Sequence, residues 1–260
     1  MVKRDLTKLY QLWFGIGMLG YSLVATAIVN VDNLHFQDAK EPLTGSVSLS
    51  GASISGNTEQ SNVSLDAQVQ WNQPEHINLL VLGYDYGKIN QQRNVNNAFM
   101  HLRHVRHHTD FLDSEFYMQA EENEFTRLNY RGLYGGGVRL TLGDTPLHVT
   151  FLGMGGFREI ERIEQRTGYA DVEVQKTGRW NIYLMSRVKT DRLRFTNTIY
   201  WQPAMGETAD WRGLFVSMLK VKATDSLSMR LSLEIAHDNL PPAGVEETDN
   251  RVRSGIEYAF

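Results

Sequence analysis

Hydrophobic and polar residues alternate with period two along most of the chain. The clearest stretch sets apolar positions against polar ones in strict alternation: Val63, Leu65, Ala67, Val69 and Trp71 against Asn62, Ser64, Asp66, Gln68 and Gln70. Side chains of a β-strand point alternately to its two faces, whereas a helix would show a period of 3.6 residues. This stretch is therefore predicted to be a strand with one apolar and one polar face.

Similar alternation predicts strands in the rest of the chain, and their expected ranges are 43–54, 77–87, 95–106, 112–121, 128–142, 147–157, 178–189, 193–202, 211–223, 227–237 and 249–260. With 62–71 these make twelve, and single-chain bacterial membrane barrels have an even number of strands. All six prolines fall at links or strand edges, where a missing N–H does not interrupt a hydrogen-bond ladder.

The expected links alternate in length. Those after even-numbered strands are short, and those after odd-numbered strands are mostly longer, including 88–94, 158–177 and 203–210. Bacterial membrane barrels have short periplasmic turns and longer external loops. We therefore expect an all-β protein, a transmembrane antiparallel up-and-down β-barrel of 12 strands with both termini in the periplasm. A soluble β-sandwich is the alternative with the same alternation.

The last predicted strand ends on an aromatic residue. Ile256, Tyr258 and Phe260 fall on one of its faces, and Arg253 and Glu257 fall on the other. This strand resembles the closing strand of bacterial outer-membrane β-barrels. The resemblance implies that Ile256, Tyr258 and Phe260 form the insertion signal read by the barrel-assembly machinery. It also implies a location in the outer membrane of a Gram-negative bacterium, among outer-membrane lipids and lipopolysaccharide.

The N-terminal stretch has the organisation of a secretory signal peptide. Lys3, Arg4 and Lys8 precede an uncharged, mostly apolar segment, 12–24, and Ala25-Thr26-Ala27 is a small-x-small cleavage pattern. A single transmembrane anchor is the alternative. The expected organisation is a cleaved signal peptide at 1–27, a periplasmic lead-in at 28–42 and the barrel at 43–260.

Composition excludes several classes of protein. The chain has no cysteine, so disulfides and thiolate metal sites are excluded. The formal net charge of −4 becomes −6 once the basic signal peptide is removed, which argues against nucleic acid as a partner. After the signal peptide, no apolar run is long enough for a membrane-spanning helix.

Three segments carry a family resemblance: Gly56–Thr58 before a long alternating strand, Tyr84–Gly87 followed by Arg93 and Asn94, and Leu128–Arg131 opening a glycine-rich strand. In these segments the chain resembles the YdiY-like, salt-induced outer-membrane proteins, a domain of unknown function. The resemblance implies an outer-membrane barrel linked to salt or envelope stress, and it supplies no established activity.

The polar faces assign the residues expected to line the lumen. The basic ones are Arg103, Arg131, Arg139, Arg187, Lys189, Arg194, Arg212, Lys220, Lys222, Arg230, Arg251 and Arg253, and the acidic ones are Asp66, Asp85, Glu115, Glu121, Glu234 and Glu257. The lumen would carry an excess of positive charge, and a tube of one sign concentrates the opposite ion. The hypothesis is a narrow, porin-like passive channel that favours small anions; a plugged structural barrel without transport is the alternative.

A lipid hydrolase is the third alternative, because some barrels act on outer-membrane lipids. His237-Asp238-Asn239 is the only suggestive cluster, and no serine accompanies it in a recognisable pattern. His101, His104, His107 and His108 lie close together in sequence, but positions 101 and 104 of a strand point to opposite faces. We therefore expect no enzymatic activity, no catalytic residue, no metal and no cofactor.

Overall fold

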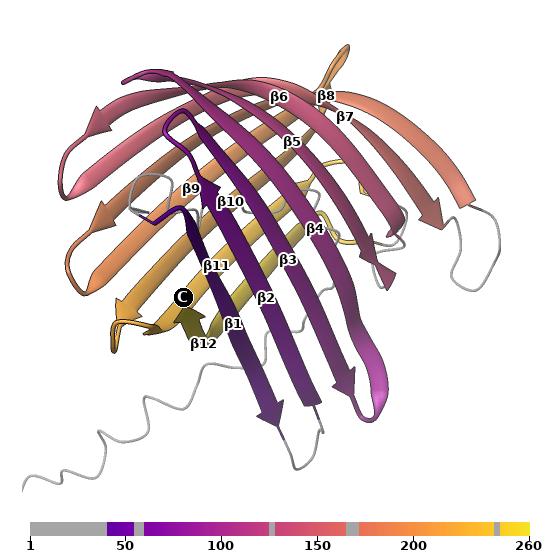
Figure 1. Ribbon diagram of the computed structural model, residues 1–260. Helices are drawn as coiled ribbons and strands as arrows, with labels where there is room; N and C mark the ends of the chain where they lie inside the picture. Colours follow the sequence, from indigo (N-terminus) through magenta and orange to yellow (C-terminus); the bar gives the residue numbers. More distant parts are fainter. Residues whose placement is uncertain (1–40, 55–59, 125–127, 165–171, 242–244) are drawn as a thin grey trace, which may run out of the picture.

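The protein is a closed barrel of twelve antiparallel strands (Figure 1). The computed structural model describes residues 41–54, 60–124, 128–164, 172–241 and 245–260. The strands, in chain order, are β1 (Leu43–Ile54), β2 (Gln60–Asn72), β3 (His76–Ile89), β4 (Gln92–Thr109), β5 (Leu112–Asn123), β6 (Leu128–Asp144), β7 (His148–Glu164), β8 (Val172–Lys189), β9 (Leu193–Ala204), β10 (Glu207–Lys222), β11 (Leu227–Asp238) and β12 (Thr248–Ala259). The prediction of twelve antiparallel strands closed into a barrel is confirmed. Within these ranges no helix is long and apolar enough to cross a membrane.

Each strand pairs with its neighbours in sequence, and β1 pairs with β12 to close the wall. The backbone of Gly45 exchanges two hydrogen bonds of 3.0 Å with that of Phe260. Pairing continues from there to Ser50 opposite Gly255. Both described ends of the chain therefore lie at the same end of the barrel, which we call the turn end, and the opposite end is called the loop end.

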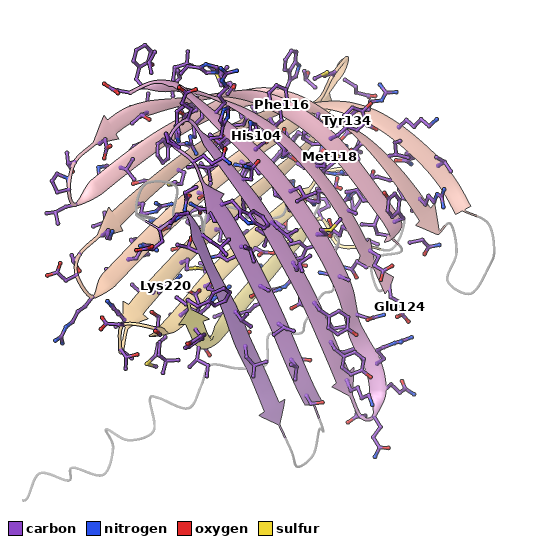
Figure 2. The ribbon with its side chains drawn as sticks, in the orientation of Figure 1. His104, Phe116, Met118, Glu124, Tyr134 and Lys220 are labelled. Atoms are coloured by element: carbon purple, nitrogen blue, oxygen red, sulfur yellow. The ribbon has the colours of Figure 1, made fainter. Side chains whose placement is uncertain are left out.

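The two faces of the wall differ as the alternation predicts. On β5, Phe116 and Met118 are 62% and 61% exposed on the outside, and Figure 2 shows them beside Tyr134 of β6. Glu115 and Gln119, on the other face of β5, are buried. Exposed apolar side chains on the outside and buried polar ones on the inside are the arrangement of a barrel surrounded by lipid.

Three expected loops are corrected by the structure. Most of 158–177 is strand, because β7 and β8 pair out to Glu164 opposite Val172. The many charged residues of this segment favoured a loop. In the structure their side chains alternate between the two faces of a strand. The expected loop at 88–94 shrinks to Asn90 and Gln91, which both have positive φ, and that at 203–210 shrinks to a turn at Gly206 with φ 93°. Tight hairpins of this kind need left-handed residues.

The predicted signal peptide, 1–27, and the lead-in up to residue 40 lie outside the described residues. The barrel begins at Leu43 and its last paired residue is Phe260. The contrast in link length between the two ends is weaker than the sequence suggests, because β3–β4 and β9–β10 are joined by two-residue turns at the loop end.

Glycines on β6 and β7 let an aromatic side chain cross the inner wall. Tyr183 of β8 reaches over β7 and β6 to Glu115 of β5, and its hydroxyl donates to the carboxylate at 2.9 Å. A Cβ added at Gly153 would overlap the Tyr183 ring, and one at Gly137 would overlap the Met154 carbonyl oxygen. A side chain at Gly153 would block the path of the ring, and one at Gly137 would clash with the β7 backbone.

We predict that Gly153→Ala lowers the free energy of unfolding by about 1–3 kcal/mol, the usual cost of overpacking. The new methyl group would displace Tyr183 and break its hydrogen bond to Glu115. Gly143→Ala is the matched control, because a Cβ at Gly143 meets nothing within 4 Å. Urea titrations of the protein refolded in lipid vesicles, followed by tryptophan fluorescence, would measure both changes. Equal stability of the two variants would contradict this account of Gly153.

Candidate functional site: a charged interior bridged by ion pairs

A cluster of buried charges occupies the loop-end half of the interior. Arg131 of β6 donates from Nε to Glu161 Oε1 of β7 at 2.6 Å, and Arg179 of β8 donates from Nε to Glu159 Oε1 at 2.6 Å. Arg212 of β10 contacts both acids, at 3.0 Å to Glu159 and 3.2 Å to Glu161. All five side chains are almost fully buried. Each of the five charges therefore has at least one opposite charge beside it within the cluster.

The same arginines extend the cluster around the wall. Arg179 donates to Asp210 of β10 at 2.8 Å, and Arg212 donates to Asp238 of β11 at 2.8 Å. Arg131 lies 3.4 Å from Glu121 of β5. The loop-end cluster thus connects β5 to β11 through side chains alone. A guanidinium group suits this role because its fixed fork of donors serves several carboxylates at once.

A second cluster lies on β4, β5 and β6 toward the turn end. Arg139 donates from Nε to Asp113 Oδ2 at 2.9 Å, and His107 Nδ1 lies 2.6 Å from the other oxygen of that carboxylate. Glu115 accepts from Tyr183 and lies 3.7 Å from Arg103. These contacts join side chains on strands that are already neighbours, apart from Tyr183.

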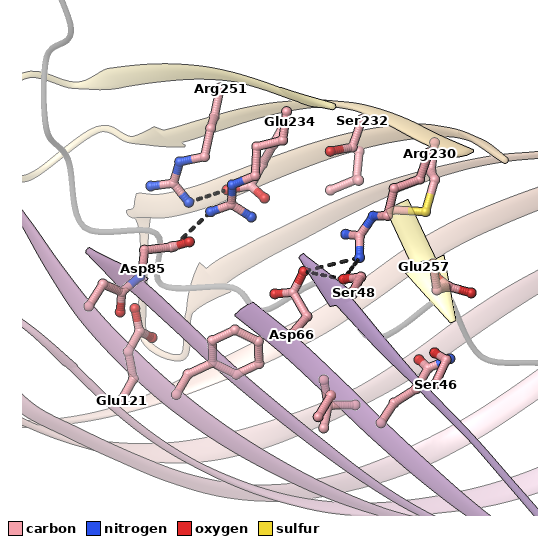
Figure 3. Close-up of a pocket in the computed structure, with 18 residues that line it drawn as sticks. Ser46, Ser48, Asp66, Asp85, Glu121, Arg230, Ser232, Glu234, Arg251 and Glu257 are labelled. Atoms are coloured by element: carbon pink, nitrogen blue, oxygen red, sulfur yellow. Dashed lines mark hydrogen bonds and ion pairs between the residues drawn. The ribbon is translucent and has the colours of Figure 1, made fainter. Parts of the chain in front are cut away.

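A third set of ion pairs lies beside the β1–β12 seam, and two of its pairs cross from the C-terminal strands to the N-terminal ones (Figure 3). Arg230 of β11 lies 3.0 Å from Asp66 of β2 and also donates to Ser48 of β1. Arg253 of β12 lies 2.8 Å from Asp85 of β3. Arg251 pairs with Glu234 at 3.3 Å and Lys220 pairs with Glu257. Side chains therefore link the two halves of the chain inside the barrel.

The structure places most of the expected lumen residues in these sets, namely Arg103, Arg131, Arg139, Arg212, Lys220, Arg230, Arg251, Arg253, Glu115, Glu121, Glu234, Glu257, Asp66 and Asp85. Arg187 is buried and Arg194 is half-buried, while Lys189 lines a cavity at the turn end. Lys222 is exposed and lies 2.9 Å from Asp225 in the turn. Its hydrogen bond and charge lower the pKa of the Asp225 carboxyl below its usual value.

Among the residues that the structure describes, the expected excess of positive charge in the lumen is not found. Sequence reasoning left six buried or half-buried acids out of the interior: Asp113, Glu159, Glu161, Asp210, Asp238 and Asp249. It also missed one base, Arg179. Glu159 and Glu161 were assigned to a loop that is strand, although their alternation with Ile160 and Arg162 could have revealed them. The acids cancel the surplus, so the electrostatic basis for anion preference is lost.

Apolar side chains fill a further part of the interior. Tyr183, Met185, Tyr200, Leu214 and Val216 form one buried cluster with Val149 and Phe151 of β7. Val149, Phe151 and Phe157 share one face of β7, and all three are buried inside the barrel. β7 has apolar residues on both faces, with Leu152 and Met154 outside, so alternation alone cannot orient it. A second cluster joins Ile77, Leu79, Val81 and Val105.

The histidines flagged in the sequence do not converge. His101 lies 3.2 Å from Gln119 inside the barrel, while His104 contacts Asn78, His107 contacts Asp113 and His108 contacts Ser114. Over the described part of the chain, no group of three or more His, Cys, Asp or Glu residues is placed to hold a metal ion.

The side chains of the cluster at 237–239 do not lie together either. His237 Nδ1 lies 2.9 Å from Thr248 Oγ1, and its ring packs on Trp211 at 4.6 Å between centroids. Asp238 points to the other face and accepts from Arg212. His237 and Asp238 therefore do not form the base–carboxylate contact that orients a catalytic histidine.

We predict that Arg131→Met lowers the free energy of unfolding by about 3–5 kcal/mol, because Glu121 would lose its buried counter-charge and Glu161 would keep only that of Arg212. Arg93→Met is the matched control: its partner Glu124 is exposed, and such surface pairs contribute about 1 kcal/mol or less. Urea unfolding in lipid vesicles would measure both. A loss below 1 kcal/mol for Arg131→Met would show that the loop-end cluster does not depend on this cation.

Solved structures with a similar fold are outer-membrane barrels. An outer membrane channel from Pseudomonas putida matches with a TM-score of 0.51 and 11% identity over 88% of this chain and 99% of that one. The NanC porin matches with a TM-score of 0.49 and 12% identity over 83% and 98% of the two chains. Identities this low show a shared fold and nothing about solutes.

No curated protein sequence matched the chain. A family model described as "Protein of unknown function, DUF481" matches residues 47–260, which is nearly the whole barrel from β1 to the C-terminal residue. The chain therefore belongs to the DUF481 family.

Proposed function

We propose that the protein is an integral outer-membrane barrel of a Gram-negative bacterium, with its turn end and both termini in the periplasm. The support is the exposed apolar outer face, the buried polar interior and the shared fold with an outer-membrane channel. The expected YdiY-like identity, the response to salt or envelope stress and the signal peptide belong to the same proposal. Lipopolysaccharide and outer-membrane lipids would be its surroundings.

The proposed function is that of a barrel closed to bulk solute flow, with one narrow polar passage along β1, β2, β11 and β12. Three adjoining cavities carry this proposal. One of about 370 Å³ opens at the turn end, the middle one measures about 80 Å³, and one of about 170 Å³ lies toward the loop end. The middle cavity is the constriction, and Arg230 reaches Asp66 and Ser48 there.

A cavity of about 80 Å³ has room for only a few water molecules. The passage would therefore admit water and small ions when the Arg230–Asp66 pair opens, and it would exclude sugars and peptides. Its charges are balanced, so we propose no preference for anions. This revises the anion-favouring channel hypothesis toward the plugged barrel.

We propose no catalytic role. His237 and Asp238 lie on opposite faces of β11 and have separate partners, which argues against a hydrolase site at this cluster. Unchanged lipid turnover in a His237→Ala variant would agree with this view.

We predict that the refolded wild-type protein shows no steady openings in a planar bilayer. The double variant Asp66→Ala with Arg230→Ala should show steady openings, because it removes the side chains of the constriction. A salt gradient should give a reversal potential near zero for the variant. Asp113→Ala with Arg139→Ala is the matched control, because this pair lies outside the passage. Steady anion-selective openings of the wild type would overturn the proposal.

We predict that Phe260→Ala reduces the amount of folded protein in outer-membrane fractions several-fold, because the ring packs against Gly45 at the closing seam and carries the proposed insertion signal. Phe111→Ala is the control, since Phe111 is an equally exposed phenylalanine in a turn, 59% against 61% for Phe260. Heat-modifiable migration in gels would report folding. If both variants assemble equally well, Phe260 is not part of the insertion signal.

A further inference from the structure

The seam between β1 and β12 is paired over only part of its length. Ladder pairing stops at Ser50 opposite Gly255. Beyond it, β1 continues to Ile54 paired with β2, and β12 extends back to Thr248 paired with β11. Among the described residues, Asn250–Ser254 of β12 have no ladder partner on β1. Toward the loop end, the wall therefore has an unpaired stretch between its first and last strands.

An unpaired stretch is costly where a barrel wall faces hydrocarbon. Backbone N–H and C=O groups find no water there, which is why membrane barrels are closed. The outer face beside the gap is apolar at Val63 and Val252, which are 50% and 68% exposed. Next to them, Gly51, Asn250 and Ser254 are exposed and small or polar. The gap is thus a polar notch in an apolar surface.

A cavity of about 170 Å³ lies at this gap. Ser50, Asn62 and Ser64 line it from β1 and β2, and Asn250 and Ser254 line it from β12. Its charged lining residues are two acids, Asp85 and Asp249, and two bases, Arg251 and Arg253. Because these charges balance, the cavity favours an uncharged group that both donates and accepts hydrogen bonds. At about 30 Å³ per water, it has room for a headgroup the size of glycerol.

The gap cavity adjoins the constricted cavity further inside. Both are lined by Asp85, Arg251 and Arg253, and Figure 3 shows Asp85 reaching across from β3 toward the C-terminal strands. The ion pair of 2.8 Å between Asp85 and Arg253 joins the two sides where the backbone ladder is missing. We call this ion pair the latch, because it joins β3 to β12 across the open half of the seam.

We propose that the open half of the β1–β12 seam is a lateral binding site for a single-chain amphiphile with an uncharged, hydroxylated headgroup, such as a monoacylglycerol. The acyl chain lies outside against Val63 and Val252. The headgroup enters the gap cavity and hydrogen-bonds with Ser64, Asn250 and the backbone groups of β12 that have no partner on β1. The site rests on the proposed membrane location and is independent of any conduction through the passage.

Cross-linking the seam tests the site, and the absence of native cysteine makes the chemistry specific. Gly51→Cys with Ser254→Cys, joined by a short bifunctional thiol reagent, would close the gap. Leu49→Cys with Ile256→Cys, joined in the same way, is the control, because these residues already face each other in the paired half. The probe is a spin-labelled monoacylglycerol added to the full barrel in phosphatidylcholine bilayers, with the immobilised fraction read by electron paramagnetic resonance.

We expect the closed-gap protein to lose about tenfold in apparent affinity and the control to bind like the wild type. Equal binding by the two cross-linked proteins, both heat-modifiable in gels, would overturn the proposal. A spin-labelled fatty acid should bind several-fold more weakly, and the reverse preference would overturn the uncharged headgroup. Disulfide-linked dimers of Ser254→Cys in bilayers would show instead that a second copy occupies the gap.

The latch provides a second, independent readout. Asp85→Asn should raise affinity for the monoacylglycerol several-fold, because the headgroup no longer competes with an ion pair. Asp113→Asn is the matched control, a carboxyl-to-amide change in a buried pair with Arg139 far from the seam. Increased binding in both variants would indicate general loosening of the barrel and would overturn the role of the latch.

Discussion

The closure of the wall is the constraint on which the rest of this structure depends. A strand edge in an apolar surrounding has no solvent to satisfy its N–H and C=O groups. The first strand must therefore meet the last, and it does so through Gly45 and Phe260 at the turn end and through the pairs up to Ser50 and Gly255. Every other neighbour in the wall is brought together by a hairpin, but this pair depends on the whole chain.

The interior solves a different problem, which is to fill a twelve-stranded tube. Eight strands leave room only for side chains and sixteen leave a channel. Here two large apolar clusters and three sets of ion pairs occupy the space between. Arg131, Arg179 and Arg212 each contact more than one carboxylate, so the charges hold one another in place. Removing one member of such a buried pair leaves an uncompensated charge, so the members of each set depend on one another.

Much of the architecture could be predicted from the sequence because alternation is a local signal. The strand ending at Trp71 and the closing strand with Ile256 and Tyr258 were predicted close to their observed bounds. The hairpin turns at Asn90 and Gly206 were missed, because polar residues around a two-residue turn look like a longer loop. Position along the chain does not reveal how far a hairpin ladder extends.

The composition of the interior was harder to predict. β7 has apolar residues on both faces, so no periodicity distinguishes Phe151, which is inside, from Leu152, which is partly exposed. Glu159 and Glu161 looked like loop residues because charge is usually solvated. Their inward position depends on Arg131, Arg179 and Arg212, which approach from other strands, and pairing of that kind is a tertiary property.

The ion pairs differ in how far apart their members lie along the chain. Arg139 and Asp113 are separated by 26 residues and Arg131 and Glu161 by 30, whereas Arg230 and Asp66 are separated by 164 and Arg253 and Asp85 by 168. Short-range pairs can form as each hairpin is added, but contacts between distant residues carry a larger loop-closure cost and form late. During assembly, Asp66 and Asp85 therefore gain their arginine partners only when the last strands have formed. Complementary charges on the earliest and latest strands would then select the correct edges at the moment the cylinder closes.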